Sequence, residues 1–594
     1  MWNRLKFFLP GENTRMIIIA AIIGLMSGVA IIVFREAVAL VHEQVFVRGY
    51  EWLRIGEGGW RTMLLPLLPI CGMVLLIPFS VAFPGSVNGY TFPNFLRRVN
   101  LENGVIRARN IVLKIISTAL TIGTGNSAGV EGPIAVIGGC LGSLVGQKRR
   151  VSGRRMKVYI AAGCAGGIAG IFNAPLAGLF FAAEIVLLGT YEIASFSALV
   201  IASALSTVVA RAWFGAAPTF PVPKYHMVNP FVEIPLYALM AVLVGGLAVL
   251  HIRFFYYTRD QFKKLPLHPQ LKPIVGALLV GCIGIAFPQV MGDGYEYIEK
   301  ALSGHGIALI MLALIFLKSI ATAITLGSGG SGGVFAPALF IGAVCGGAFG
   351  SAVHYLLPQY TASAGAYAAI GIGAFLAAST HAPMTAIFLL FEMTGNYVII
   401  IPVMLVSILS TITAGRLYHD SIDTVDFSRE GINIHEGREV AILKSVKVGK
   451  AMTEDVDFIS ENANMSQLLE LFSIAKNSFY FPVVNYKGLM VGVVSMQDVK
   501  NILHDDEGQQ VCHLVGAICT REVIMLTPED NIYDAIQLFD VKGIEEIPVV
   551  DSLEEPWVLG MLKRQDVLAA YNHEILKRGI SKKAESIRLV CSAS

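Results

Sequence analysis

The chain has 594 residues, of which 54% are hydrophobic and 15% charged, and its mean hydropathy is +0.63. This composition is typical of a membrane protein and excludes a single ordinary soluble domain. The formal net charge of +2 gives no indication of a nucleic-acid partner. The eight cysteines are scattered without Cys-x-x-Cys spacing, which predicts neither a disulfide framework nor a metal site.

Residues 1–15 carry charges but lack the pattern of a cleavable signal, and we expect them to form a cytoplasmic N-terminus. Long apolar runs then predict membrane segments at 16–34, 63–83, 236–250, 273–287, 306–317 and 398–412. Shorter, glycine-broken runs lie between them. These predict helices that end inside the membrane, where unpaired backbone is tolerated only beside a protein cavity. Two loops rich in arginine and lysine, 97–109 and 148–157, are expected on the cytoplasmic side.

A polar loop that opens an apolar helix occurs twice in the chain. The sequence SAGVEGP at 127–133 returns 204 residues later as SGGVFAP at 331–337. The flanking sequence is repeated too, because Lys114 and Thr121 match Lys318 and Thr325, and NAPL at 173–176 matches HAPM at 381–384. The membrane part therefore consists of two related halves, an arrangement with which many transporters build a site at the interface of their repeats.

The chemistry of this loop indicates an anion site. Glycines allow backbone N–H groups to approach a ligand closely, and proline starts a helix at its first turn. Four unpaired N–H groups and the positive end of the helix dipole then face the ligand. Close helix packing is the alternative explanation for the glycines. Glu131 favours the site, because an ionisable group at membrane depth is usually functional, although it could also cap the helix.

The sequences GVEGP (129–133) and GVFAP (333–337) resemble the Gly-x-Glu-Gly-Pro and Gly-x-Phe-x-Pro motifs of the CLC family of chloride channels and proton/chloride antiporters. The resemblance covers residues 16–430. It implies an α-helical polytopic membrane protein with an inverted repeat and broken or re-entrant helices. It further implies a homodimer that transports chloride, requires no cofactor and is not an enzyme. In such a protein Glu131 is the gate, and the anion contacts fall on Gly129, Gly132, Val334 and Phe335.

Two anion contacts of the family are changed in this sequence. The family's Gly-Ser-Gly-Ile-Pro aligns with GYTFP at 89–93, which puts Tyr90 at the position of the anion-binding serine and leaves Thr91 as a competing donor. The family's tyrosine from the last membrane helix aligns with Asp423, while Tyr418 lies five residues earlier. A carboxylate beside an anion path is repulsive unless it is protonated or turned away. Either Tyr418 takes the role or the inner gate is remodelled.

A third change concerns proton coupling. Antiporters of the family commonly carry an inward-facing glutamate directly after the glutamate that matches Glu184, and here that position is Ile185. Isoleucine can neither donate nor accept a proton, which favours a channel-like or loosely coupled pathway. A proton-coupled chloride antiporter is the alternative, with buried water, Glu184 or a protonated Asp423 as another relay. Because Glu392 repeats Glu184 in the other half, we interpret Glu184 as a structural residue.

After residue 430 the sequence becomes that of a soluble region, with a linker at 431–447 and a tail at 575–594. Two similar copies, 448–505 and 513–574, each predict strand, helix, two strands, helix, and the pair resembles tandem CBS domains. Such pairs often bind adenine nucleotides through a Ser or Thr and an Asp three residues later. Ser495 and Asp498 match this pattern. Asp566 has Lys563 at the hydroxyl position, and both aspartates could instead cap helices.

Two other classes of membrane protein also carry CBS pairs. A metalloprotease needs His-Glu-x-x-His, and HEQVF at 42–46 lacks the second histidine. A cation transporter should place several acidic side chains in the membrane segments. The candidates here, Glu131, Glu184 and Glu392, are too few to favour that class. We therefore expect a chloride pathway in a multi-pass protein of the plasma (inner) membrane, with a regulatory CBS pair in the cytoplasm.

Overall fold

The computed structural model describes residues 12–189, 193–217, 219–220, 227–434, 440, 443–475, 479–505 and 514–574. The contacts between residues divide the chain into a first unit that ends at Gly431 and a second unit that begins at Ile432. The expected N-terminus lies outside the described residues up to position 11, and the expected tail 575–594 lies outside them entirely.

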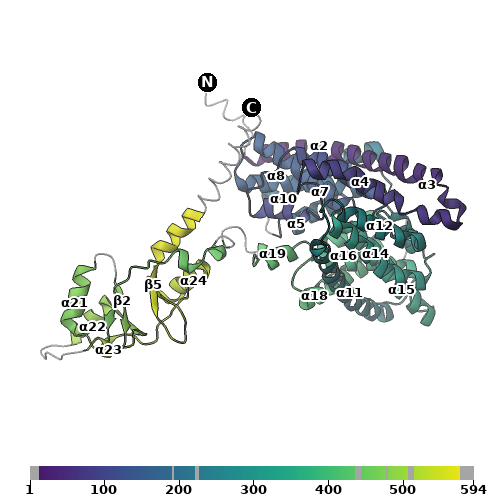
Figure 1. Cartoon of the computed structure of the whole chain (residues 1–594). Coiled ribbons are helices and arrows are strands. Elements are labelled where there is room, and N and C mark those ends of the chain that lie inside the picture. The colour runs from purple at the N-terminus through teal and green to yellow at the C-terminus, as the bar shows by residue number, and fades with distance from the viewer. Residues whose placement is uncertain are drawn as a thin grey trace, which may run out of the picture. The chain divides into compact units, whose positions relative to one another are not determined.

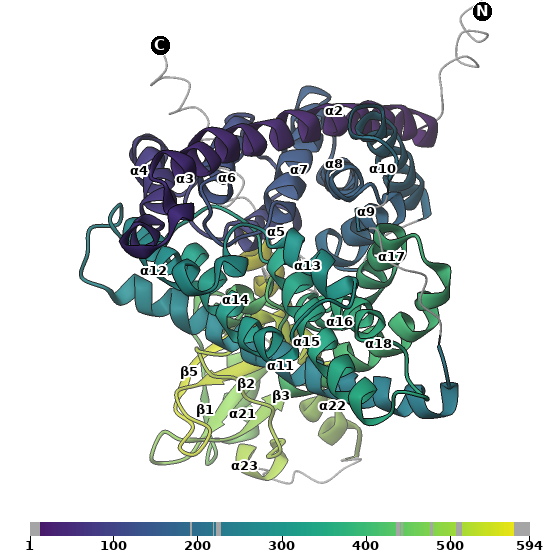
Figure 2. The same cartoon turned by 90° about the vertical axis from the view of Figure 1, so that its right-hand side faces the viewer.

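The first unit is helical, as predicted (Figure 1). Its first half contains α2 (Glu12–Val41), α3 (Arg48–Trp52), α4 (Leu67–Ala82), α5 (Phe92–Asn100), α6 (Arg109–Gly123), α7 (Glu131–Lys148), α8 (Gly153–Phe172), α9 (Pro175–Phe181) and α10 (Ile193–Phe214). Its second half contains α11 (Pro230–Lys264), α12 (Lys272–Ala286), α13 (Tyr295–Leu302), α14 (Ala308–Ser328), α15 (Phe335–Leu356), α16 (Ala364–Thr380), α17 (Pro383–Thr394), α18 (Ile400–Leu417) and α19 (Val425–Arg429). The helix α2 lies across α7, α8 and α10 (Figure 2).

Among the described residues, seven helices are long and apolar enough to cross a membrane. Two of them, α10 and α15, were not on the predicted list of membrane segments. Their hydropathies of 1.6 and 1.7 are lower than the 2.9 of the first span, because serine, glycine and alanine dilute their apolar character. Small residues suit α15, since 78% of its apolar window is buried inside the protein instead of facing lipid.

Several glycines are explained by close helix packing. Where α7 crosses α8, a Cβ added to Gly163 would lie 2.0 Å from the carbonyl oxygen of Gly138. The related crossing of α15 with α16 has the same feature, because a Cβ on Gly371 would lie 2.4 Å from the Gly342 carbonyl oxygen. No side chain fits between these backbones. The packing explanation therefore holds inside the helices, whereas the glycines of the repeated loop need a separate one.

The second unit holds the two CBS copies. The first copy runs through β1 (Ile459–Ser460), α21 (Met465–Ile474), β2 (Tyr480–Val484), β3 (Met490–Ser495) and α22 (Met496–Asp505). After the short α23 (Val515–Ile518), the second runs through α24 (Ile532–Lys542), β4 (Glu546–Val550), β5 (Val558–Lys563) and a helix at 564–574. In the first copy β1 is parallel and β3 antiparallel to β2, and β4 and β5 are antiparallel. A parallel bridge between Leu526 and Val549 stands where β1 lies in the first copy.

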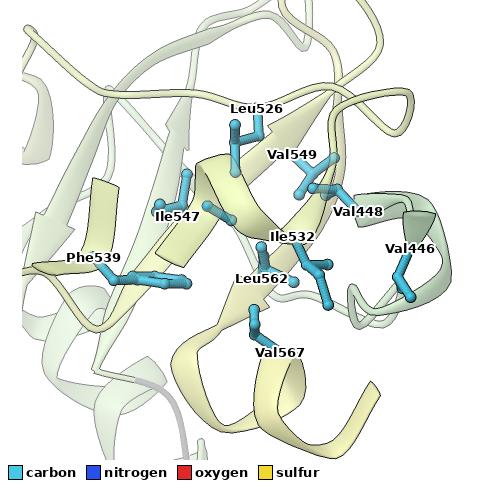
Figure 3. Close-up of a cluster of buried hydrophobic side chains, with 10 residues drawn as sticks. Val446, Val448, Leu526, Ile532, Phe539, Ile547, Val549, Leu562 and Val567 are labelled. Atoms are coloured by element: carbon cyan, nitrogen blue, oxygen red, sulfur yellow. The ribbon is translucent and has the colours of Figure 1, made fainter. Parts of the chain in front are cut away.

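The two copies exchange their leading segments. Val446 and Val448 lie at the start of the first copy but pack in the core of the second, against Leu526, Ile532 and Val549 (Figure 3). In return, Val515 lies at the start of the second copy and packs in the core of the first with Ile459, Leu468 and Phe481. The core of each copy therefore contains apolar side chains from the start of the other copy. The two copies consequently fold together as one unit.

Candidate functional site

The repeated loops meet face to face in the first unit. The amide of Gly129 donates to the carbonyl of Gly333 and the amide of Gly333 donates to the carbonyl of Gly129, both at 2.8 Å. A Cβ at Gly129 would lie 2.3 Å from Glu131 Oε2 and 2.9 Å from the amide nitrogen of Ala336. A Cβ at Gly132 would lie 3.2 Å from Gly333 Cα. These glycines bring the starts of α7 and α15 together, which helix packing alone does not require.

In each of the two loops, a backbone amide donates a hydrogen bond to a threonine hydroxyl from the other half. The amide of Ser331 donates to Thr121 Oγ1 at 3.0 Å, and the amide of Ser127 donates to Thr325 Oγ1 at 3.2 Å. Each threonine belongs to the half opposite its loop. The sequence repeat is therefore also a repeat of contacts, and the paired helix starts lie on the interface of the two halves, where duplicated transporters place their sites.

Glu131 lies between the two helix starts. It is the first residue of α7 and is completely buried. Its Oε2 accepts the amide of Ala336, in the first turn of α15, at 3.1 Å. Its Oε1 accepts the phenol of Tyr295, the first residue of α13, at 2.5 Å. The carboxylate therefore accepts hydrogen bonds from the starts of both α15 and α13.

The other predicted contacts surround the same point. Val334 and Phe335, at the start of α15, are each 5% exposed. The Phe335 ring lies with its centroid 5.9 Å from that of Phe172 and 6.0 Å from that of Phe181. Two aromatic rings therefore pack against Phe335 at the start of α15.

Tyr90, a predicted anion contact, and Asp423, a candidate for the inner gate, are in direct contact. The Tyr90 phenol donates a hydrogen bond to Asp423 Oδ1, and Asp423 is 5% exposed. Two backbone contacts position the aspartate: Tyr256 donates to the carbonyl of Ile422 at 2.8 Å, and the amide of Ile422 donates to Ser379 at 2.9 Å. By the resemblance, Tyr90 stands at the position of the family's serine and Asp423 at the position of its tyrosine. The phenol therefore lies on the segment before α5, and its partner is a carboxylate.

The two alternative residues lie differently. Tyr418 is the residue directly after α18 and is half-buried, with the guanidinium of Arg253 5.5 Å from the centre of its ring. Thr91 is the residue before α5 and makes no side-chain cap to that helix. The structure therefore places Asp423, and not Tyr418, at the Tyr90 hydroxyl.

Glu184 and Glu392 form a reciprocal pair of helix caps. Glu184 accepts the amides of Met384 and Thr385 at the start of α17, at 3.0 and 2.7 Å. Glu392 accepts the amides of Leu176 and Ala177 at the start of α9, at 3.0 and 2.9 Å. Carboxylates at helix N-termini are stabilising, which accounts for both. The neighbouring Ile185 is 5% exposed, in the π-helical turn Ala182–Val186.

Tyr295 is the site residue that sequence reasoning missed. In the repeat it stands at the position of Thr91, just before the equivalent helix α5, and 164 positions separate it from Glu131. It lines a cavity of about 890 Å³ together with Arg35, Asp293 and Lys300, whereas Glu131 is fully buried behind it. The offset of 204 residues, which relates Tyr295 to the predicted donor Thr91, is the signal in the sequence that connects this short helix with the site.

In the second unit, the predicted nucleotide residues also serve as local hydrogen-bond partners. Asp498 Oδ2 accepts both the amide and the hydroxyl of Ser495 at 2.7 Å. Asp566 Oδ2 accepts the hydroxyl of Thr453 at 3.3 Å. Lys563 Nζ lies 3.8 Å from Glu546 Oε1, and burial raises the pKa of the Glu546 carboxyl while Lys563 opposes the shift. The Ser495–Asp498 geometry is that of a helix cap.

Comparisons with known proteins agree with these observations. The family described as "Voltage gated chloride channel" matches residues 70–415, and the CBS domain family matches 448–505 and 515–573. The H(+)/Cl(-) exchange transporter ClcA of Vibrio campbellii is 30% identical over 411 residues, which are 68% of this chain and 86% of that protein. Chloride channel protein CLC-f of Arabidopsis thaliana is 27% identical over 640 residues, 94% and 80% of the two chains.

Two solved structures share the fold. A slow cyanobacterial Cl-/H+ antiporter aligns with a TM-score of 0.64 and 23% identity, covering 70% of this chain and 98% of the other. A eukaryotic CLC transporter aligns with a TM-score of 0.62 and 18% identity, covering 93% of this chain and 98% of the other. The second alignment extends over most of both units.

Proposed function

The chain belongs to the voltage gated chloride channel family, or CLC, with a tandem CBS region, and we propose that Glu131 gates its chloride pathway between the starts of α7 and α15. The observation that carries this proposal is the Glu131 carboxylate itself, buried and bonded to the Ala336 amide. While ionised, it occupies the place of an anion. Once protonated, it no longer competes with chloride for the backbone donors, and the pathway opens.

For the transport mode, we propose a channel-like or loosely coupled pathway. Ile185 supports it, because the buried isoleucine offers no proton site at the position where antiporters of the family carry a glutamate. Glu184 is engaged by the start of α17, which leaves it poorly suited as a substitute. The alternative is antiport, favoured by the name of the Vibrio relative and by Asp423, which provides a carboxyl at the inner end of the path.

Reconstituted protein tests this proposal. We expect proteoliposomes to release chloride readily, with a reversal potential that follows the chloride gradient and little uphill proton movement. Gradients of sulfate and of monovalent cations should drive little flux. Proton uptake in fixed proportion to chloride, lost in Glu131→Gln, would establish the antiport alternative, and cation flux in place of chloride would refute the chloride pathway.

The remote alternative, a cation transporter, is disfavoured by the surroundings of the buried carboxylates. In the described part of the first unit, each of them faces hydrogen-bond donors. Glu131 and Asp423 accept phenol groups, and Glu233 accepts the amides of Val228 and Ala362 at 2.7 Å. A cation site would instead direct several oxygens without such donors at one point.

The proposal includes assembly and regulation. We propose a homodimer with one pathway per subunit, set in the plasma (inner) membrane with the CBS unit in the cytoplasm; membership of the family supports the dimer. We propose that the CBS unit binds an adenine nucleotide at Ser495 and Asp498, with Asp566 at the second position. The supporting feature is the Ser-x-x-Asp pattern at the start of α22.

Calorimetry on the full-length protein should detect weak binding of ATP, ADP or AMP, and Asp498→Ala should reduce the affinity. Because the substitution also removes a helix cap, typically about 1 kcal/mol, Asp530→Ala is the matched control. Asp530 accepts the amide and hydroxyl of Thr527 in the same geometry, at 2.6 and 3.0 Å, outside the predicted nucleotide position. Equal loss of binding in both variants, or no binding at all, would reduce the CBS pair to a packing module.

A further inference from the structure

The phenol of Tyr295 makes a short contact with the proposed gate. It donates to Glu131 Oε1 at 2.5 Å, while the Ala336 amide holds Oε2. A hydrogen bond to an ionised carboxylate is roughly twice as strong as one between neutral groups. The carboxylate is thus held on one oxygen by the α15 start and on the other by α13. The Tyr295 hydrogen bond is made only while the Glu131 carboxylate is in this place, and it is lost when the carboxyl moves away.

The backbone before Tyr295 is fixed by a buried lysine. Lys318, fully buried in α14, donates through Nζ to the carbonyls of Val290 and Gly292, both at 2.9 Å. The amide of Gly292 donates to the carbonyl of Gly125 at 3.2 Å, which ties the same segment to the first half. Lys114, the equivalent residue in the first half, has a different partner, because its Nζ donates to the Ser331 hydroxyl at 3.3 Å. Lys318 therefore anchors the segment before α13, whose counterpart in the first half is the segment before α5.

The turn into α13 then directs the ring. Gly294 has φ of 84° and faces Phe340, whose Cδ2 would lie 2.6 Å from an added Cβ. The Tyr295 amide donates to Asp293 Oδ1 at 3.2 Å, and the ring packs edge-on against Phe220 with centroids 5.5 Å apart. A left-handed glycine, an amide contact and an aromatic neighbour determine where the phenol points, so its contact with Glu131 does not depend on a freely rotating side chain.

Tyr295 also separates the gate from the cavity of about 890 Å³ whose wall it forms. The charged groups near the Tyr295–Glu131 pair are Asp293 beside it, Arg35 on α2 and Lys318 on α14. The cavity wall adds His42, Glu296 and Lys300. Charges of both signs therefore face this contact, and the phenol is the group that touches the carboxylate from this side.

We propose that Tyr295 is a positioning residue that holds the ionised Glu131 carboxylate in its blocking place and releases it when the carboxyl is protonated. The proposal rests on the proposed role of Glu131 as the gate. Protonation removes the charge that strengthens the phenol bond, so the restraint is strong when the gate is closed and weak when it is open. Tyr295 thereby makes the open fraction depend more steeply on whether Glu131 is ionised.

The test compares Tyr295→Phe with wild type in proteoliposome chloride efflux. Losing a hydrogen bond to a charged group should raise efflux at neutral pH by about tenfold. The increase should fall towards none in acid, where Glu131 is protonated in both proteins. Tyr297→Phe is the matched control, because Tyr297 lies on the same helix and lines the same cavity while its ring packs on Phe340 with centroids 5.8 Å apart. That control should behave as wild type.

A second background separates this inference from the gate itself. In Glu131→Ala there is no carboxylate to hold, and Tyr295→Phe should then change efflux by less than about twofold. Calorimetric chloride affinity in detergent should rise in Tyr295→Phe by the same factor as efflux, which excludes a loss of folding as the cause. If Tyr295→Phe is silent while Glu131→Gln alters the pH response, the positioning role is overturned and the gate stands. If Glu131→Gln leaves the pH response unchanged, the gate itself fails.

Discussion

Glu131→Gln is expected to remove most of the pH dependence of chloride efflux. In wild type, efflux should rise by up to about tenfold per unit of acidification while Glu131 is mainly ionised, because the protonated fraction of one group changes by at most that factor. The amide imitates the protonated carboxyl and cannot acquire charge. Efflux from proteoliposomes, measured with a chloride electrode across a series of pH values, should therefore be high and nearly constant in the variant.

Two further variants make the result specific. Glu131→Ala also removes the competing carboxylate and should behave in the same way, so abolished flux in well-folded protein would count against competition with chloride. Glu392→Gln is the matched glutamate control. Its side chain caps α9 through two amides, so we expect a loss of thermal stability of about 1 kcal/mol with the wild-type pH response preserved. A full pH response in Glu131→Gln would exclude Glu131 as the gate.

The duplicated loop explains why so much of the site could be located from sequence. Its glycines, proline and Glu131 are local signals, and the repeat indicated that two such loops share a site. In the structure the two loops are joined by reciprocal hydrogen bonds between the equivalent residues Gly129 and Gly333. The fold class was accessible for the same reason. The spans α10 and α15 were missed because their small and polar residues give them the lowest hydropathies among the seven spans, 1.6 and 1.7.

The remaining contacts depend on residues that differ between the two halves or that follow the last membrane helix. Tyr295 reaches the gate because Lys318 fixes the segment before it, although Lys318 and Lys114 are equivalent in sequence and differ in their partners. Similarly, α18 ends at Leu417, and the irregular segment after it decides whether Tyr418 or Asp423 faces Tyr90. Alignment by residue spacing could not decide between Tyr418 and Asp423. It assumes that the helix continues to residue 423, whereas α18 ends at Leu417.

The contact between Tyr90 and Asp423 leads to the second large expected effect. Asp423→Asn should strengthen chloride binding at the inner end of the pathway and raise efflux at neutral pH. The amide keeps an acceptor for the Tyr90 phenol but carries no charge. Two unit charges 4 Å apart repel by about 4 kcal/mol at an effective dielectric constant of about 20, so the gain in chloride affinity could approach about a thousandfold. Calorimetric chloride titration of wild type and variant measures it.

Asp420→Asn provides the control for the change of charge. Asp420 lies three residues earlier and accepts the hydroxyl of Ser428 instead of a phenol, so its neutralisation should leave chloride affinity near the wild-type value. Acidification should reduce the difference between Asp423→Asn and wild type, because protonated Asp423 is also uncharged. Unchanged affinity in Asp423→Asn would place this carboxyl outside the anion path. An increase that disappears in acid would identify Asp423 as a second titrating barrier, in series with Glu131, and would locate the proton site that Ile185 does not supply.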